Sequence, residues 1–358
     1  MNSIVSKPKT SPNGFVLIAL LWVLAALSLL ALDLASTVRT EAGIARSVGE
    51  AEKAYFVARG GMEEVIYRLS FPDKDSTQQL KTFPYADGMN HFWISNEEVV
   101  CHVAILDEAG KLDLNQCKEE NLQKLMETLG VESGRSTELA QAIDDWRKAD
   151  HSTGSSQSDQ PANRPALGKP GLMSVEDLLS VPGMSREILY GIPRRGPDGR
   201  IQLARGLAQY VTVYSKKSQI NLNYAAPEVL ASLPELDLDA ANSIVQERQD
   251  QPYTGSSDLN QRTKVVLRGE ALSQVSTEPS GVYCLIASAR LRGSNVHRSL
   301  RTIVKLDRTF KTGHERLMWY DEDWPPAGIL KWTEPKDNSN LLQVLGFFTK
   351  SITPMGEL

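Results

Sequence analysis

The sequence predicts an α+β protein, in which a long N-terminal helix packs on a small antiparallel sheet and a large all-helical insertion interrupts that sheet. Three observations predict this fold. Residues 15–32 form an apolar stretch that continues as an amphipathic helical pattern. Alternating, valine- and isoleucine-rich stretches occur near 99–105 and again over 283–306. The residues between those two stretches carry helical spacing and turn signals instead.

The composition is that of a globular protein and excludes several functional classes. Hydrophobic residues make up 41% and charged residues 23% of the 358 residues, which is not a disordered composition. A formal net charge of -5 argues against a dedicated nucleic-acid binder, whose affinity comes mostly from Lys and Arg on phosphates. The sequence has no nucleophile-elbow motif and no phosphate-cradling glycine loop, so we predict no catalytic residues and no enzyme activity.

The cysteines leave two interpretations open. Cys101, Cys117 and Cys284 form no CxxC pair and no Cys/His cluster, which argues against a zinc site. An oxidising compartment would permit one disulfide and one free thiol. The alternative is that all three are small buried hydrophobic residues.

Residues 15–32 predict a transmembrane helix. Eighteen residues without a charge span about 27 Å as a helix, close to the hydrocarbon thickness of a bilayer. Lys7 and Lys9 precede the span, which keeps the N-terminus cytoplasmic. A cleaved secretory signal is disfavoured because Asp33 stands where a cut after Ala35 requires a small residue. A buried core helix is disfavoured because it does not need apolar residues around its whole circumference.

The helical pattern continues beyond this span. No proline interrupts the chain before Pro72, and Gly60 and Gly61 are the weak point of the pattern. We therefore predict one continuous helix of more than fifty residues, whose second half packs an apolar stripe onto a sheet. The stripe consists of Leu34, Val38, Ala45, Val48, Tyr55, Met62, Ile66 and Leu69.

The residues around Gly14 and Phe15 resemble the cleavage site of type IV prepilins. In that family a dedicated peptidase cuts between the glycine and the phenylalanine and methylates the new N-terminus, which would be Phe15. Most members carry glutamate five residues after the cut, where this chain has Ala19. Absence of that glutamate is typical of the K-type minor pseudopilin of type II secretion. Residues 15–35 and 58–69 also look like that protein.

The resemblance implies a structural function. A K-type minor pseudopilin is a single-pass inner-membrane protein with most of its chain in the periplasm. Its implied partners are the I-type and J-type minor pseudopilins, the major pseudopilin and the prepilin peptidase, and no nucleic acid is expected. The missing glutamate is thought to pair with the terminal amine of the subunit ahead, so Ala19 predicts a position at the filament tip, initiating or capping assembly.

The middle of the chain predicts the insertion. Residues 107–110 form a turn signal, and 111–115 are expected to return as a second strand beside 99–105. The segments 174–192 and 227–248 look like two copies of a helix–turn–helix unit similar to helix-hairpin-helix and SAM-like folds. The second copy has three carboxylates, Glu235, Asp237 and Asp239, where a phosphate would bind, so repulsion disfavours nucleic acid.

One ion site is predicted. Asp144, Asp145, Asp150 and Asp159 are oxygen donors near a loop, the kind of ligand that calcium prefers, and Asp145, Asp150 and Asp159 are the predicted ligands. K-type relatives bind calcium around a pattern that this chain matches at Asp145, Trp146, Ala149 and Asp150, with Lys148 in place of the middle acid. The alternative is a solvated, charged helix end.

The chain after the insertion returns to strands. Residues 283–291 and 297–306 alternate and flank a turn, so one α/β domain is interrupted by an insertion. The competing hypotheses are a minor type IV pilin and a membrane-anchored DNA-binding protein, and a salt-dependent shift of a DNA duplex would favour the latter. The predicted segments are the leader 1–14, the transmembrane helix 15–35, the first part of the α/β domain 36–118, the helical insertion 119–274, the second part of the sheet 275–310 and the tail 311–358.

Overall fold

A computed structural model describes most of the chain and divides it into two units. The described residues are 13–71, 90–148, 171–195, 201–203, 206–249, 251–263 and 265–321. The units are Met1–Lys53 and Ala54–Leu358, and each is considered by itself below.

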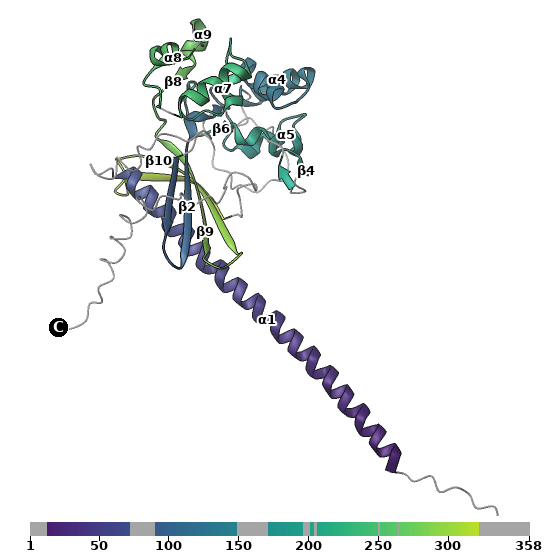
Figure 1. Cartoon of the computed structure of the whole chain (residues 1–358). Coiled ribbons are helices and arrows are strands. Elements are labelled where there is room, and N and C mark those ends of the chain that lie inside the picture. The colour runs from purple at the N-terminus through teal and green to yellow at the C-terminus, as the bar shows by residue number, and fades with distance from the viewer. Residues whose placement is uncertain are drawn as a thin grey trace, which may run out of the picture. The chain divides into compact units, whose positions relative to one another are not determined.

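The N-terminal helix is continuous, as the sequence predicts. Helix α1 spans Asn13–Ser70 and is drawn in purple in Figure 1. Its part in the first unit is exposed throughout residues 16–49. Its part in the second unit buries one stripe, formed by Ala58, Met62, Val65 and Ile66. The spacing of three and four residues puts these side chains on one face of the helix.

The sheet has five antiparallel strands in the order β1-β2-β9-β10-β11. Side chains on one face, which we call the inner face, pack against α1, while those on the other, the outer face, point away from it. The strands are β1 (Asn90–Ser95), β2 (Val99–Asp107), β9 (Val282–Leu291), β10 (His297–Leu306) and β11 (His314–Tyr320). The inner face includes Cys101, Val103, Ile105, Leu285, Ala287, Ala289, Leu300 and Val304.

The insertion connects β2 to β9, as predicted, but it is not all-helical. Short strands pair within it as β3–β6, β4–β5 and β7–β8, so the prediction of an all-helical block was wrong on this point. Its helical elements are η1 (Glu108–Gly110), α3 (Glu119–Thr128), α4 (Ser133–Lys148), η2 (Val175–Ser180), α5 (Arg186–Tyr190), η3 (Leu207–Gln209), α6 (Pro227–Ala231), α7 (Leu238–Glu247), α8 (Ser256–Arg262) and α9 (Gly269–Ser273). Its strands are β3 (Leu112–Asp113), β4 (Pro193–Arg195), β5 (Ile201–Leu203), β6 (Val211–Thr212), β7 (Ile220–Asn221) and β8 (Val275–Ser276).

The strand expected over 111–115 does not return along β2. Leu112–Asp113 instead pairs in parallel with β6, far along the chain, because β9 already occupies the free side of β2. The sheet also differs from the expected boundaries at its other end. Val275–Ser276 belongs to the insertion as β8, and β11 adds a strand within the segment expected to be a tail. The hairpin of β9 and β10 forms as predicted.

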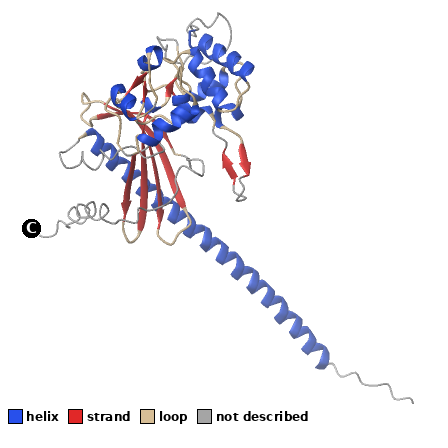
Figure 2. Cartoon of the chain, turned by 45° about the horizontal axis from the view of Figure 1, so that its top comes forward, coloured by secondary structure: helices blue, strands red, loops and turns tan. Residues whose placement is uncertain are grey.

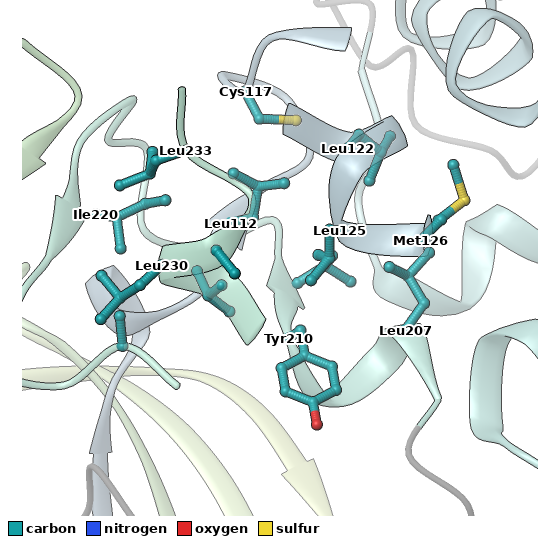
Figure 3. Close-up of a cluster of buried hydrophobic side chains, with 14 of the residues drawn as sticks. Leu112, Cys117, Leu122, Leu125, Met126, Leu207, Tyr210, Ile220, Leu230 and Leu233 are labelled. Carbon is teal, nitrogen blue, oxygen red and sulfur yellow. The ribbon is translucent and has the colours of Figure 1, made fainter. Parts of the chain in front are cut away.

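One hydrophobic core holds the insertion together. Figure 3 shows Leu122, Leu125 and Met126 of α3 close to Leu207 and Tyr210. The same cluster includes Leu230 and Leu233 from the second half of the insertion. Figure 2 shows the short helices of the insertion grouped together, apart from the long strands. Both halves therefore contribute to a single core rather than to two independent domains.

Candidate functional site: the apolar helix and the insertion

The side chains in the apolar half of α1 are exposed in the part of the chain that the structure describes. The side chains of Leu17 and Trp22 are 62% and 73% exposed, and the other large apolar side chains up to Leu34 are exposed as well. Eighteen consecutive residues of this helix are long and apolar enough to cross a membrane, and none of them is buried. Exposing such a continuous apolar surface to water is unfavourable, so it requires lipid or other apolar helices as its surroundings.

The predicted processing residues lie at the start of this helix. α1 begins at Asn13, so Gly14 and Phe15 fall in its first turn, while their side chains lie outside the described residues. Ala19 is exposed, in a stretch from 16 to 32 that has no acidic residue. The first carboxylate after Phe15 is that of Asp33.

A buried aspartate joins the two ends of the insertion. The carboxylate of Asp107, at the end of β2, accepts hydrogen bonds from the backbone N–H of Ala109 at 2.8 Å and of Ser280 at 3.0 Å. Ser280 also donates its hydroxyl to the same carboxylate. Burial raises the pKa of Asp107, and the bonds from Ser280 and Ala109 oppose that shift. The residue where the chain leaves the sheet, Asp107, is thus hydrogen-bonded to Ser280, just before the chain returns to the sheet.

The insertion consists of two similar copies of one unit. The first copy runs from β3 to β6 and the second from β7 to β8, and in each the first strand pairs in parallel with the last. In each copy an asparagine side chain forms hydrogen bonds with both the backbone N–H and the backbone C=O of one distant residue. Asn115 does this for Leu172, and Asn223 does it for Tyr253 at 2.8 and 2.9 Å.

An arginine occupies the corresponding place in each copy. Arg147, near the end of α4, and Arg248, at the end of α7, each donate Nη1 to two backbone carbonyls in the turn after the first strand. Arg248 is completely buried. The accepting residues are Leu114 and Cys117 in the first copy, and Leu222 and Ala225 in the second. The sequence analysis missed both arginines, although the similar turns in LDLNQC and INLNYA are a signal that points to them.

The two segments that the sequence analysis compared occupy different places in these copies. Segment 227–248 corresponds to α3 and α4 of the first copy, since Arg248 matches Arg147. Segment 174–192 corresponds to α8 and α9 instead. Asp177 accepts from the N–H of Met173 at 2.8 Å, as Asp258 does from that of Thr254 at 3.0 Å. The similarity of the two segments reflects a shared helix–turn–helix form, not an equivalent position.

The hairpin before α7 is unsuited to phosphate. Asp237 uses its own carboxylate to accept from the N–H of Ala240 at 2.8 Å, so a helix-start donor is already satisfied. Lys124 donates to the carbonyls of Leu233 and Leu236, both at 2.6 Å. The hairpin thus presents backbone carbonyls, which accept hydrogen bonds, where a phosphate would need backbone N–H donors. That the unit binds no nucleic acid stays a prediction, and these contacts support it.

The predicted calcium ligands are only partly described. Asp145 is exposed on α4, whereas Asp150 and Asp159 lie outside the described residues. Lys148 pairs with Asp144, and Arg147 pairs with the same carboxylate. The hydrogen bond from Lys148 holds the pKa of Asp144 below its usual value. Among the described residues, no group of three or more His, Cys, Asp or Glu side chains is arranged to hold a metal ion.

Comparison with known families bears on the second copy. Residues 220–277 match the sequence model of the family described as type II secretion system (T2SS), protein K. The matched residues run from the first residue of β7 to just beyond β8, so they coincide with the second copy. This part of the chain is therefore similar to protein K of the type II secretion system.

A solved structure and the curated proteins complete the comparison. The GspK-GspI-GspJ complex from the type 2 secretion system of enterotoxigenic Escherichia coli contains a chain of similar structure, with a TM-score of 0.48 and 12% sequence identity. The similarity covers 80% of this chain and 99% of that one. No curated protein matches the sequence.

The apolar part of α1 is a candidate for a single-pass membrane anchor. The periplasmic orientation of the rest of the chain, leader cleavage and N-terminal methylation stay predictions for this chain.

Proposed function

We propose that this chain is a K-type minor pseudopilin that occupies the tip of the periplasmic pseudopilus and initiates or caps its assembly. The observation that carries the proposal is where the insertion is attached. β2 ends and β9 begins at the end of the sheet where α1 also ends, since the β10–β11 turn at Gly313 approaches Ser70 there. A subunit added beyond that end would meet the insertion.

The apolar half of α1 supports the same position. A subunit inside a filament must neutralise the terminal amine of its neighbour, and a carboxylate in the apolar helix would do so. This chain has Ala19 at that place and no acidic residue from 16 to 32. A subunit with no neighbour ahead has no amine to pair with, and it avoids the cost of an unpaired carboxylate in lipid.

The processing step and the partners belong to the same proposal. We infer that the prepilin peptidase cuts between Gly14 and Phe15, and that the processed helix inserts beside those of I-type and J-type minor pseudopilins and joins the major pseudopilin. The GspK-GspI-GspJ complex of the type 2 secretion system supports partners of this kind, because it joins a K-type protein to I- and J-type proteins. A minor type IV pilin shares such an N-terminus but does not account for the protein K match.

Cross-linking along the filament tests the tip position. We would introduce one cysteine by Leu20→Cys, in the exposed apolar part of α1. The native thiols do not interfere, since Cys101, Cys117 and Cys284 are all buried. We expect cross-links to the minor pseudopilins and no ladder of repeated self-cross-links. The corresponding cysteine in the major pseudopilin is the control and should give a ladder. Repeated self-cross-linking of this chain along the shaft would make it an ordinary subunit.

A deletion tests the role of the insertion separately. Asp107 and Tyr283 lie directly opposite each other on neighbouring antiparallel strands, so an Asn-Gly turn can join them after removal of 108–282. We expect the shortened protein to enter the filament shaft and to lengthen filaments. Ala19→Glu in the full chain should be neutral or disruptive, with a cost of about 2.5 to 3.5 kcal/mol for an unpaired acid in the bilayer. Improved secretion by Ala19→Glu would argue against the tip.

A further inference from the structure

The side chain of Tyr214 packs against two separate hydrophobic clusters. One is the core of the insertion, and the other lies on the outer face of the sheet. The outer-face cluster consists of Ala104, Val282, Cys284, Ile286 and Ile303. Among the residues that the structure describes, no other side chain is packed against both clusters. Tyr214 therefore joins the core of the insertion to the sheet.

Hydrogen bonds fix the main chain on both sides of Tyr214. Its own N–H donates to the hydroxyl of Thr212 at 3.1 Å. The buried carboxylate of Asp113 accepts from the Ser215 hydroxyl at 2.9 Å and from the Lys216 N–H at 2.8 Å. Lys216 has a φ of 53°, a left-handed conformation that this last bond holds in place. Because Asp113 and Thr212 are opposite each other on β3 and β6, the first copy presents Tyr214 from a rigid base.

The second copy shows that the repeated unit does not need a tyrosine at this place. Strands β6 and β8 are the last strands of the two copies, so Tyr214, two residues after β6, corresponds to Glu278, two residues after β8. The Glu278 N–H donates to the hydroxyl of Ser276 at 3.0 Å, just as the Tyr214 N–H does to Thr212. The same turn thus forms around an exposed glutamate. The aromatic ring of Tyr214 is therefore explained by its contact with the sheet and not by the fold of the unit.

A hydrogen bond extends the contact to the last strand of the sheet. The hydroxyl groups of Tyr214 and Tyr320 are hydrogen-bonded to each other. Tyr320 lies opposite Arg301 on β10, whose guanidinium is 4.0 Å from the centroid of the Tyr320 ring. Burial raises the pKa of Tyr214, so its hydroxyl stays protonated near neutral pH. The ring and the hydroxyl of one side chain thus hold the insertion to several strands at once.

We propose that Tyr214 is the positioning residue that holds the insertion in one orientation on the sheet, so that the two move as a rigid body. The chain enters and leaves the insertion at Asp107 and Ser280, which are hydrogen-bonded to each other. Two neighbouring connections form a hinge, about which a domain can turn unless side-chain contacts oppose the rotation. Tyr214 opposes it on the outer face, and a hydrogen bond between Tyr224 and Asn90 adds support at β1. The consequence rests on the proposed function: in a tip subunit, a rigid body transmits a load on the insertion directly to α1.

The distance between two spin labels in the full-length protein tests this role. Glu97→Cys, in the turn between β1 and β2, reports on the sheet, and Gln246→Cys, on α7, reports on the insertion. Both positions are exposed, whereas the native thiols are buried and stay unlabelled. Pulsed electron paramagnetic resonance should give one narrow distance distribution for this labelled chain. Adding Tyr214→Ala should make the distribution about twice as wide or more, because the contact that opposes rotation is lost.

Further variants separate positioning from stability. Tyr214→Gln places a side chain shaped like that of Glu278 in the turn, so the unit should fold and the distribution should again widen. Tyr214→Phe keeps the ring and should restore the narrow distribution. Tyr190→Ala is the matched control, because it removes a ring packed against the insertion core and should leave the distribution narrow. A narrow distribution for Tyr214→Gln, or equal widening for Tyr190→Ala, would overturn the proposal. Neither outcome depends on a filament, so the tip position is tested independently.

Discussion

The sulfur of Cys101 lies against the main chain of Gly61, so closely that a Cβ built on the glycine would be 2.5 Å from Sγ. The side chains of Ile94 and Val103 would lie 3.4 and 3.5 Å from that Cβ. At Gly61, α1 and the inner face of the sheet therefore lie in close contact. Its neighbour Gly60 has no atom within 4 Å of its own Cβ position.

The two glycines should respond in opposite directions to alanine. Gly61→Ala overpacks the interface and should lower the free energy of unfolding by about 1 to 3 kcal/mol. Gly60→Ala should raise it by about 0.5 to 1 kcal/mol, because alanine is the better helix former and meets no neighbour. Urea denaturation of the two variants measures this. Adding Cys101→Ala to Gly61→Ala should recover part of the loss, and equal effects of both alanines would contradict the close approach.

Arg248 should be essential to the second copy. Arg248→Met removes two charged hydrogen bonds from buried carbonyls, at 2.7 Å each, and should cost about 2 to 4 kcal/mol of stability. Arg268→Met is the control. Arg268 is exposed and offers only its backbone to α9, so the change should stay within about 0.5 kcal/mol. Similar melting temperatures for both variants would argue against this role.

The thiols should be inert in the folded protein. Burial raises the pKa of Cys101 to about 12 and that of Cys117 to about 11. All three cysteines are free and buried, which agrees with the small-hydrophobe interpretation and not with a disulfide. Iodoacetamide at pH 8 should therefore label none of them until the protein unfolds. Rapid labelling under native conditions would contradict their burial.

The same thiols make stability depend on pH in a known direction. Their folded pKa values lie above the unfolded value, near 8.5, so between these values the unfolded state holds fewer protons. Their contribution is fully present below about pH 8.5 and is lost as the pH rises through 11 to 12. The slope is about 1.4 kcal/mol per pH unit for each thiol. Cys101→Ala should flatten the alkaline part of the stability curve.

Processing should leave Phe15 as the first residue. Mass spectrometry of membrane-extracted protein should find residues 1–14 missing and a methylated amine. Gly14→Val should block the cut, because a branched side chain hinders the extended backbone from entering a narrow peptidase site. Pro12→Ala, next to the site, is the control. An intact N-terminus, or a cut after Ala35, would exclude the prepilin interpretation.

Calcium should raise the melting temperature if the predicted ligands form a site. A ligand that binds only the folded state stabilises it, by about 2.7 kcal/mol at 100 times its dissociation constant. Asp150→Ala should abolish the shift, whereas Asp239→Ala, at the exposed hairpin of the second copy, should leave it intact. The absence of a shift at millimolar calcium would mean that Lys148, which already pairs with Asp144, marks a lost site.

Much of the architecture was predictable because it depends on local patterns. The apolar stretch and the stripe that continues from it specify α1, since helical hydrogen bonds join residues four apart. The hairpin of β9 and β10 needs only two alternating stretches and a turn. Gly14, Phe15 and Ala19 were likewise recognisable as a short motif, although their role stays a prediction.

The rest was decided by contacts between residues far apart in the chain. Leu112 pairs with Val211 instead of lying beside β2, because β9 occupies that edge of β2. A strand of two residues also has too short a sequence pattern to select its partner. The equivalent positions of Arg147 and Arg248 in the two copies are recognisable only from the backbone carbonyls to which their side chains donate hydrogen bonds. The sequence by itself determined the long N-terminal helix and the interrupted sheet. Only the tertiary structure decided the strand partners, the repeated unit and the close contact at Gly61, since each depends on which distant surfaces exclude water together.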